Sequence, residues 1–215
     1  MIKKLLCKLR PIYNRLPFNN YIRKRRGLKI KYGKASLTKC RIENYGRGNE
    51  IIFLGDCNLR QCQFLIYGND NIITIGNKVR ASTTLFRVED DGNDMNIGDR
   101  TIFIGDTNLT CIEGTKLHVG KDCLFALETV IRTGDGHSIL NMDGVRINPS
   151  QDVILGNHIW LGNKVTIQKG CQIADNCIVG TNAVATKIFD KPNCALAGIP
   201  AKILRENVSW EAKRI

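Results

Sequence analysis

Residues 155–184 repeat one pattern of apolar and polar positions every six residues. Each hexad opens with an aliphatic residue and carries a small or β-branched residue four positions later. The opening residues are Leu155, Leu161, Ile167, Ile173 and Val179, and the second set is Ile159, Val165, Cys171, Cys177 and Ala183. A fixed short period is typical of a parallel β-helix, whereas an α-helix needs apolar residues about every 3.6 positions. The pattern therefore predicts one short strand and one turn per hexad, with both sets facing the core.

Longer and less regular coils are predicted upstream, from about residue 37. Four similar segments end on glycines that are 21, 22 and 22 residues apart, namely Gly55, Gly76, Gly98 and Gly120. Each interval holds about one coil plus a few turn residues, so stacking would bury one continuous core. We expect an all-β domain over residues 37–200. The tail at residues 201–215, which contains Trp210, is expected to cap its C-terminal end.

Positive charge is concentrated at the N-terminus. Eleven Lys and Arg residues and no acid occur before residue 32, in a chain of net charge +12. Ile2, Leu5, Leu6 and Leu9 have the spacing of one helical face, and Pro11 ends that helix. We therefore expect a basic amphipathic arm at residues 1–36.

Two uses of this arm remain open. It either binds an anionic membrane surface or an acidic polymer, or it is a solvated segment without a partner. The apolar run is too short for a signal peptide or a bilayer span, so we expect a cytoplasmic protein, peripheral at most on the inner membrane face. No nucleic-acid-binding fold follows the basic segment, which argues against nucleic acid as a partner.

The nine cysteines show no pairing pattern typical of metal or disulfide sites. Cys123, Cys171 and Cys177 fall at the small inward position of their hexads. We interpret them as small hydrophobic residues in a reducing compartment.

The six-residue period fails in one segment, at residues 134–152. Val119, Phe125 and Ile131 keep the step, but the next inward position is His137, and the small position before it is Asp135. We therefore expect a loop that leaves the coil with His137 at its base. Regular repeats break at functional insertions, and histidine is suited to proton transfer near neutral pH. A turn with an incidental histidine is the alternative.

Five motifs, in this order, resemble the hexapeptide-repeat acyltransferases of the left-handed β-helix type. They are DGHSI at 135–139, GVRIN at 144–148, LGNHIWLG at 155–162, VATK at 184–187 and AGIPAK at 197–202. Among these enzymes, the motifs are most similar to galactoside and maltose acetyltransferases and to capsular polysaccharide O-acetyltransferases, including those that modify sialic acid capsules. The N-terminal coils match only as generic repeats.

The resemblance implies acetyl-CoA as the donor, no metal, and a homotrimer with active sites between subunits. The implied reaction is O-acetylation of a sugar in a capsular or lipopolysaccharide-type polysaccharide, an acidic one being a candidate. N-acetylation of an amino sugar or nucleotide sugar is the alternative. His137 matches the general base that takes the proton of the attacking hydroxyl. Asp135 would orient the imidazolium, a task that a backbone carbonyl can also perform.

The resemblance also implies binding roles for several side chains. Trp160 occupies an outward position, where an exposed indole needs a partner. It would pack against substrate or pantetheine, or form a subunit contact. The positions that match CoA contacts are Gly162, Thr181, Thr186, Lys187, Lys202 and Arg205, and those assigned to the acceptor are Arg146, Asn148 and His158.

Two other functions fit a β-helix less well. The γ-type carbonic anhydrases bind zinc through three histidines, and this chain has His118, His137 and His158. Those enzymes place two histidines five residues apart on one chain, a pair that is missing here. A β-helix that serves only as a scaffold would leave His137 and Trp160 without a role.

Overall fold

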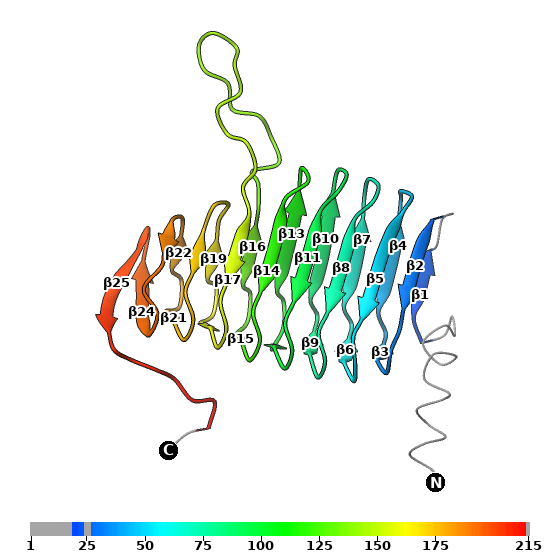
Figure 1. The fold of residues 1–215 in the computed structure, drawn as a ribbon, viewed down its shortest axis with the longest axis horizontal. Helices are drawn as coiled ribbons and strands as arrows, with labels where there is room; N and C mark the ends of the chain where they lie inside the picture. Colours follow the sequence, from blue (N-terminus) through cyan, green and yellow to red (C-terminus); the bar gives the residue numbers. More distant parts are fainter. Residues whose placement is uncertain (1–18, 24–26, 214–215) are drawn as a thin grey trace.

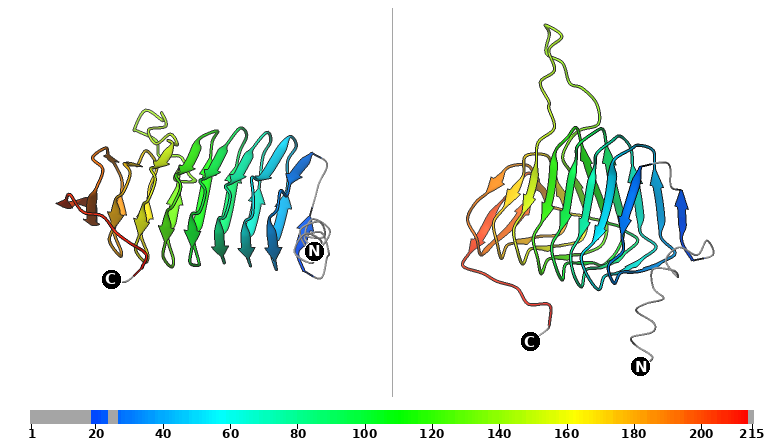
Figure 2. Two further views of the ribbon diagram at one scale, coloured as in Figure 1. Left: turned by 60° about the horizontal axis from the view of Figure 1, so that its bottom comes forward. Right: turned by 45° about the vertical axis from the view of Figure 1, so that its right-hand side comes forward.

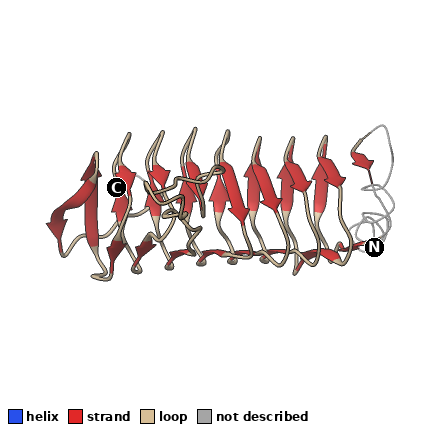
Figure 3. Cartoon of the chain, turned by 90° about the horizontal axis from the view of Figure 1, so that it is seen from above, coloured by secondary structure: helices blue, strands red, loops and turns tan. Residues whose placement is uncertain are grey.

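A computed structural model describes residues 19–23 and 27–213 of the chain. The described residues form a left-handed parallel β-helix, as the sequence predicted (Figure 1). Three sheets, here called A, B and C, make its sides, and the chain visits them in that order in each coil. Strands and loops account for all of the described chain, so it contains no helix that could cross a bilayer (Figure 3).

Each sheet contains one strand from every coil. Sheet A comprises β1 (Tyr21–Arg23), β4 (Arg41–Asn44), β7 (Gln63–Ile66), β10 (Leu85–Glu89), β13 (Asn108–Ile112), β16 (Val130–Arg132), β19 (Thr166–Ile167) and β22 (Val184–Ala185). Sheet B comprises β2 (Leu28–Lys31), β5 (Asn49–Phe53), β8 (Ile72–Ile75), β11 (Asp94–Ile97), β14 (Lys116–Val119), β17 (Val153–Leu155), β20 (Gln172–Ile173) and β23 (Ile188–Phe189).

Sheet C closes the triangle and contains the last strand of the fold. It comprises β3 (Ser36–Thr38), β6 (Asn58–Arg60), β9 (Arg80–Ser82), β12 (Ile102–Phe103), β15 (Leu124–Phe125), β18 (Trp160–Leu161), β21 (Ile178–Val179), β24 (Cys194–Gly198) and β25 (Ala201–Glu206). All neighbouring strands are parallel except β24 and β25.

The core contains the residues that the hexad pattern assigned to it. The five aliphatic residues that open the hexads and the five at the small position are all buried. Upstream, five phenylalanines continue the interior as a chain of ring contacts within and between coils: Phe53, Phe64, Phe86, Phe103 and Phe125. The eight cysteines in the described residues are buried and unpaired. Burial raises the thiol pKa of Cys123 to about 11 and that of Cys171 to about 12, so both remain protonated at neutral pH.

The repeated glycines stack at the corner between sheets B and C. A Cβ atom on Gly98 would lie 2.5 Å from the carbonyl carbon of Gly120, and one on Gly120 would lie 2.3 Å from the Gly156 oxygen. Glycine is therefore required here by the close approach of successive coils. The 22-residue spacing of these glycines is the length of one upstream coil, because hydrogen-bonded neighbours such as Asn77 and Asp99 are 22 residues apart.

The β-helix begins before the boundary predicted at residue 37. Strand β2 pairs Leu28 with Asn49, and the Lys29 and Lys31 ammonium groups each lie 2.9 Å from the Glu50 carboxylate. Alternation of Leu and Ile with outward Lys is the pattern of a strand, so part of the predicted basic arm belongs to the β-helix. The predicted helix at residues 2–9 lies outside the described residues.

The C-terminal tail covers the end of sheet C and then turns back. Strand β25 runs antiparallel to β24, with Ala195 opposite Arg205, so the last parallel strand has a partner. The following residues run back toward earlier coils (Figure 1), where the Trp210 indole N–H donates to the carbonyl of His158 at 2.8 Å.

Candidate active site

The loop predicted at residues 134–152 extends far from the β-helix at the corner between sheets A and B (Figure 2). Because the loop lengthens its coil, the stacked residues Lys121 and Asn157 are 36 positions apart in sequence, whereas Asn157 and Asp175 on the next coil are 18 apart. The loop is a hairpin. Ile147 N–H donates to the Ile139 carbonyl at 2.8 Å, and Leu140 and Arg146 form an isolated antiparallel β-bridge. Asn141 closes its tip, where its side-chain oxygen accepts from Asp143 and Val145 N–H.

The Asn148 side chain holds the two arms of the loop together. Its amide nitrogen donates to the His137 carbonyl at 2.8 Å and to Asp135 Oδ2 at 2.7 Å. Its oxygen accepts from Ile139 N–H at 2.7 Å. Asn148 is buried, so these bonds form in a site with little competing water. The amide therefore fixes the backbone that follows His137 and the Asp135 side chain that precedes it. The sequence assigned Asn148 to the acceptor, but its side-chain contacts are to the loop itself.

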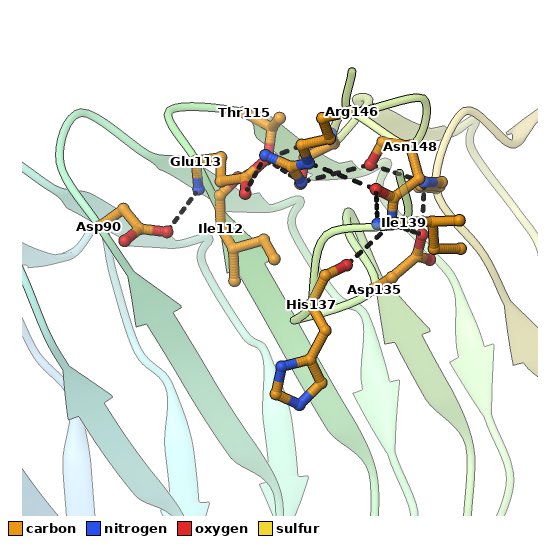
Figure 4. Close-up of polar contacts among 11 residues, drawn as sticks. Asp90, Ile112, Glu113, Thr115, Asp135, His137, Ile139, Arg146 and Asn148 are labelled. Atoms are coloured by element: carbon orange, nitrogen blue, oxygen red, sulfur yellow. Dashed lines mark hydrogen bonds and ion pairs between the residues drawn. The ribbon is translucent and has the colours of Figure 1, made fainter. Parts of the chain in front are cut away.

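Residues from the two flanking coils anchor the loop base. On the N-terminal side, both oxygens of Glu113 accept from the Arg146 guanidinium, at 2.8 and 3.0 Å. On the C-terminal side, the Lys169 ammonium lies 2.5 Å from Asp135 Oδ2 and donates to the Asn148 carbonyl at 3.1 Å. Figure 4 shows the first of these anchors together with the Asn148 contacts.

The ion pairs lower the pKa values of both loop-anchoring carboxylates. Hydrogen bonds from Lys169 and then Asn148 lower the pKa of Asp135. Hydrogen bonds from Arg146 and then Ser150 lower the pKa of Glu113. Both carboxylates are therefore ionised at neutral pH, and each holds a cation in place.

His137 is exposed, and its imidazole points away from the Asp135–Asn148 contacts (Figure 4). Within the described residues, the polar contact of His137 is made by its backbone carbonyl, and the ring is left available to a ligand. The Asp135 carboxylate binds Lys169 and Asn148 instead of the imidazole. Asp135 therefore acts on the loop that carries His137, and the orienting role expected from the resemblance is not seen in this chain.

Trp160 lies on the outer face of sheet C, as the hexad pattern predicted, with 38% of its surface exposed. Its ring centroid is 6.0 Å from that of Trp210, which is brought there by the C-terminal tail. Trp210 stacks on His158 with ring centroids 4.4 Å apart, and His158 Nδ1 lies 2.7 Å from Asn176 Oδ1. His158 is thus packed within its own chain, beside Trp160.

The candidate CoA contacts form two separate groups. Gly162 lies against the backbone of Thr181 at the corner between sheets C and A, where a Cβ atom would be 2.8 Å from Thr181 N. Lys202 and Arg205 are exposed on β25 of sheet C. Thr186 and Lys187 lie instead between β22 and β23, at the corner that carries the loop. The exposed cations suit phosphate groups, but one chain does not bring all six residues together.

The three histidines lie in different environments. His118 is on sheet B, where its Nε2 lies 3.1 Å from Asp94 Oδ2, whereas His158 is under Trp210 and His137 is in the loop. No group of three or more His, Cys, Asp or Glu side chains within residues 19–23 and 27–213 is arranged to hold a metal ion. A zinc site built from these histidines therefore has no support in the chain.

Sequence reasoning missed Glu113 and Lys169 as parts of the site and assigned Trp210 only to the tail. Glu113 and Lys169 occupy coil corners, where charged residues are common, and they meet the loop only through the stacking of coils. The sequence contained a weak signal for Lys169, because Lys169 and Gly170 form a corner on the coil directly after the one that carries the loop.

Comparison with known proteins identifies the family of this β-helix and its extended loop as one of acyltransferases. The chain is 36% identical over 186 residues to the polysialic acid O-acetyltransferase of Neisseria meningitidis, covering 86% of each protein. It is 30% identical over 118 residues to the galactoside O-acetyltransferase of Escherichia coli K12, covering 54% of this chain and 55% of that protein. No family model matches the chain.

Solved structures agree with this result. A crystal structure of a polysialic acid O-acetyltransferase has a TM-score of 0.66 and 32% identity, over 92% of this chain and 90% of that one. A crystal structure of a polysialic-acid-specific acetyltransferase has a TM-score of 0.82, over 91% of this chain and 84% of that one. Its sequence identity is 23%, so this likeness shows the fold alone. The chain belongs to the hexapeptide-repeat O-acetyltransferase family, and it is an acetyltransferase, as the sequence predicted.

Proposed function

We propose that this protein transfers the acetyl group of acetyl-CoA to a hydroxyl of a sugar in an acidic surface polysaccharide, with His137 as the general base. The observation that carries the proposal is the near full-length relationship to a polysialic acid O-acetyltransferase, 36% over 186 residues. The acceptor named for that relative is an acidic glycan. The exposed imidazole of His137, on a loop anchored from both sides, supplies the chemistry.

In the proposed reaction, His137 accepts the proton of the acceptor hydroxyl while the hydroxyl oxygen attacks the thioester carbonyl carbon. The tetrahedral intermediate collapses, the C–S bond breaks, and the imidazolium returns its proton to the departing thiolate. The products are the O-acetyl sugar and free CoA. A positioned general base contributes about 10²–10⁴ in rate. Asn148 supports this step by holding the His137 backbone carbonyl.

The active site is completed by a second copy of the chain. His137 is on the loop between sheets A and B, whereas Trp160 is on sheet C, the opposite side of the triangle. A site that uses both residues takes the loop of one copy and sheet C of another. The separation of the candidate CoA contacts into two groups has the same explanation. Head-to-tail contacts close into a ring when the rotation between neighbouring copies permits it, and we propose that they form the homotrimer.

The loop surface supports this arrangement. Five of its apolar side chains are largely exposed: Ile139, Leu140, Met142, Val145 and Ile147. Exposed apolar residues on an extended hairpin mark an interaction site. A neighbouring copy would cover them and so place His137 beside its Trp160.

We place the enzyme in the cytoplasm, with its basic N-terminal segment in contact with the inner membrane face or with the acidic acceptor. The charge imbalance before residue 32 supports this, as the segment contains eleven basic residues and no acid, and two of them, Lys29 and Lys31, pair with Glu50. Most of that segment lies outside the described residues.

The test of the function is direct. Purified protein is incubated with acetyl-CoA and a panel of acidic glycans, neutral glycans and amino sugars, and thiol release and product mass are followed. We expect an added acetyl group on an acidic glycan as a base-labile ester. An alkali-stable amide on an amino sugar would establish N-acetyl transfer instead.

A further inference from the structure

Sheet A has a hollow of about 300 Å³ at the root of the loop. Its walls come from β16, from the first residues of the loop and from β19 with the corner that follows it. Arg132, Asp135, Thr166 and Lys169 contribute polar groups to it. The volume is at the lower end for small-molecule sites, which suits one sugar unit rather than an extended cofactor.

Arg132 differs from Arg41 and Arg87 of sheet A in having no carboxylate on its own strand. Arg41 pairs with Glu43 at 2.9 Å, and Arg87 pairs with Glu89, so each has a carboxylate two residues later on its own strand. For Arg132 that position is Gly134. A side chain there would displace the Ser150 and Ile112 side chains, because a Cβ atom on Gly134 would lie 2.2 Å from Ser150 Oγ and 2.5 Å from a methyl carbon of Ile112. The glycine at this position, packed against the returning loop, thus leaves Arg132 without the counter-ion that Arg41 and Arg87 have on their own strands.

The acid nearest to Arg132 in sequence is already engaged. Asp135 pairs with the Lys169 ammonium at 2.5 Å and accepts from Asn148 at 2.7 Å. The hollow therefore contains two cations and one carboxylate, and Lys169 offsets the carboxylate. Within the described part of the chain, the exposed guanidinium of Arg132 forms no close ion pair, although its charge, after the hydrogen bonds from Lys169 and Asn148, helps to lower the pKa of Asp135. One positive charge remains for a ligand.

The position of Arg132 indicates which ligand it receives. A Cβ atom on Gly136 would lie 3.5 Å from Arg132 Nη2, so the guanidinium lies beside the residue that precedes His137. At the proposed base, the groups that react are a hydroxyl and a thioester, both uncharged. The phosphates of CoA are separated from its thioester by the whole pantetheine arm. An anion beside the residue that precedes His137 is therefore assigned to the acceptor, whereas Lys187, one coil beyond Lys169 at the same corner, is left to the phosphates of CoA.

We infer that Arg132, in the hollow between β16, β19 and the loop base, binds the carboxylate of an acidic sugar and so selects acidic acceptors. This inference rests on the proposed function and adds the residue that reads the charge of the substrate. A guanidinium presents two parallel N–H groups to a carboxylate, a geometry that Lys does not reproduce. The sugar whose carboxylate binds Arg132 is either the sugar that is acetylated or its neighbour along the polymer.

The test compares Arg132→Gln with wild type on oligomers of polysialic acid and on the same oligomers with methyl-esterified carboxylates. We expect the KM for the acidic oligomer to rise about tenfold or more, as for loss of a charged hydrogen bond. The KM for acetyl-CoA and the kinetics on the ester should stay within about twofold of wild type. The KM of Arg132→Lys for the acidic oligomer should lie between those of wild type and Arg132→Gln.

The control is Arg47→Gln, which removes one exposed arginine from the same corner several coils away and should leave all constants unchanged. Binding of both oligomers without acetyl-CoA is measured by calorimetry, a readout that does not require turnover. Equal affinity of wild type and Arg132→Gln for the acidic oligomer would overturn the inference. So would a rise confined to the KM for acetyl-CoA, or an equal loss on acid and ester. Wild-type binding without transfer to any glycan would reject the proposed function alone.

Discussion

The Lys169 ammonium lies 2.5 Å from the Asp135 carboxylate, so that a residue of the coil after the loop holds the first acidic side chain of the loop. The same ammonium donates to the Asn148 carbonyl at 3.1 Å. Asn148 in turn binds the His137 carbonyl. Lys169 is thus connected to the proposed base through two side chains, without touching the imidazole.

Lys169→Gln should reduce kcat by about ten- to a hundredfold, because small displacements of a catalytic group are costly in rate. Stability should change by less than about 1 kcal/mol, since the pair is partly exposed to water. Lys169→Arg should restore most of the activity. The control is Lys191→Gln, which breaks the pair with Glu206 on sheet C, away from the loop. Steady-state kinetics and thermal unfolding check the prediction, and equal kcat losses in the two variants would contradict it.

The loop should remain anchored at neutral pH and loosen only in acid. The pKa values of Asp135 and Glu113 are lowered from their ordinary values of 3.8 and 4.5. A carboxylate with a lowered folded-state pKa stabilises the fold above its unfolded pKa and loses this effect as pH falls through the folded value. Protease cleavage of the loop should therefore be constant down to about pH 5 and increase below about pH 4. An increase already near pH 6 would show that other groups control the loop.

The stacked glycines of the corner between sheets B and C should tolerate no side chain. Gly98→Ala places a Cβ atom 2.5 Å from Gly120 and should cost about 1–3 kcal/mol or more, as in other overpacked sites. Gly92→Ala is the matched control, because a Cβ atom there meets nothing within 4 Å. It should cost only the strain of its left-handed backbone, about 1–2 kcal/mol. Denaturant unfolding measures both, and a smaller cost at Gly98 would refute the stacking argument.

The fold was predictable where the place of a residue within its hexad determines by itself whether the side chain faces the core. In the hexads, the opening aliphatic residue faces inward whatever its neighbours do, so Leu161 and Val179 were placed correctly from the period alone. Trp160 was placed outside for the same reason. Strand β2 was missed because Lys29 and Lys31 were counted as arm charge, although the Leu28 and Ile30 alternation was visible.

The contacts of the site were less predictable, since they depend on the register between coils. Asp135 and Lys169 are 34 residues apart and meet only because a hairpin of a particular length separates their coils. Asn148 was correctly grouped with the loop but not recognised as its internal support. No local pattern encodes such a pair.

The basic residues at 23–26 should tether the enzyme to an anionic surface. A charge swap of Arg23, Lys24, Arg25 and Arg26 removes about 1 kcal/mol of attraction per residue near anionic lipid, screened over about 8 Å at physiological salt. Wild type should bind phosphatidylserine vesicles at low salt and release them at high salt, and the swap should not bind. The control reverses four exposed cations on the β-helix, which are Lys78, Arg80, Lys116 and Lys121. Unchanged vesicle binding and an unchanged KM for a polyanionic acceptor would exclude the tether.

Two inactive variants should restore activity to each other. His137→Ala should lose at least about a hundredfold in kcat with little change in acetyl-CoA affinity, and Trp160→Ala should also be impaired. If His137 of one copy meets Trp160 of the next, mixed rings contain some interfaces with both intact side chains. Free mixing gives this combination at about a quarter of the interfaces of a head-to-tail ring. Co-expressed variants with distinct tags should therefore recover about a quarter of wild-type activity. Mixed trimers verified by native mass spectrometry but without recovered activity would place the whole site on one chain, against the separation of His137 and sheet C.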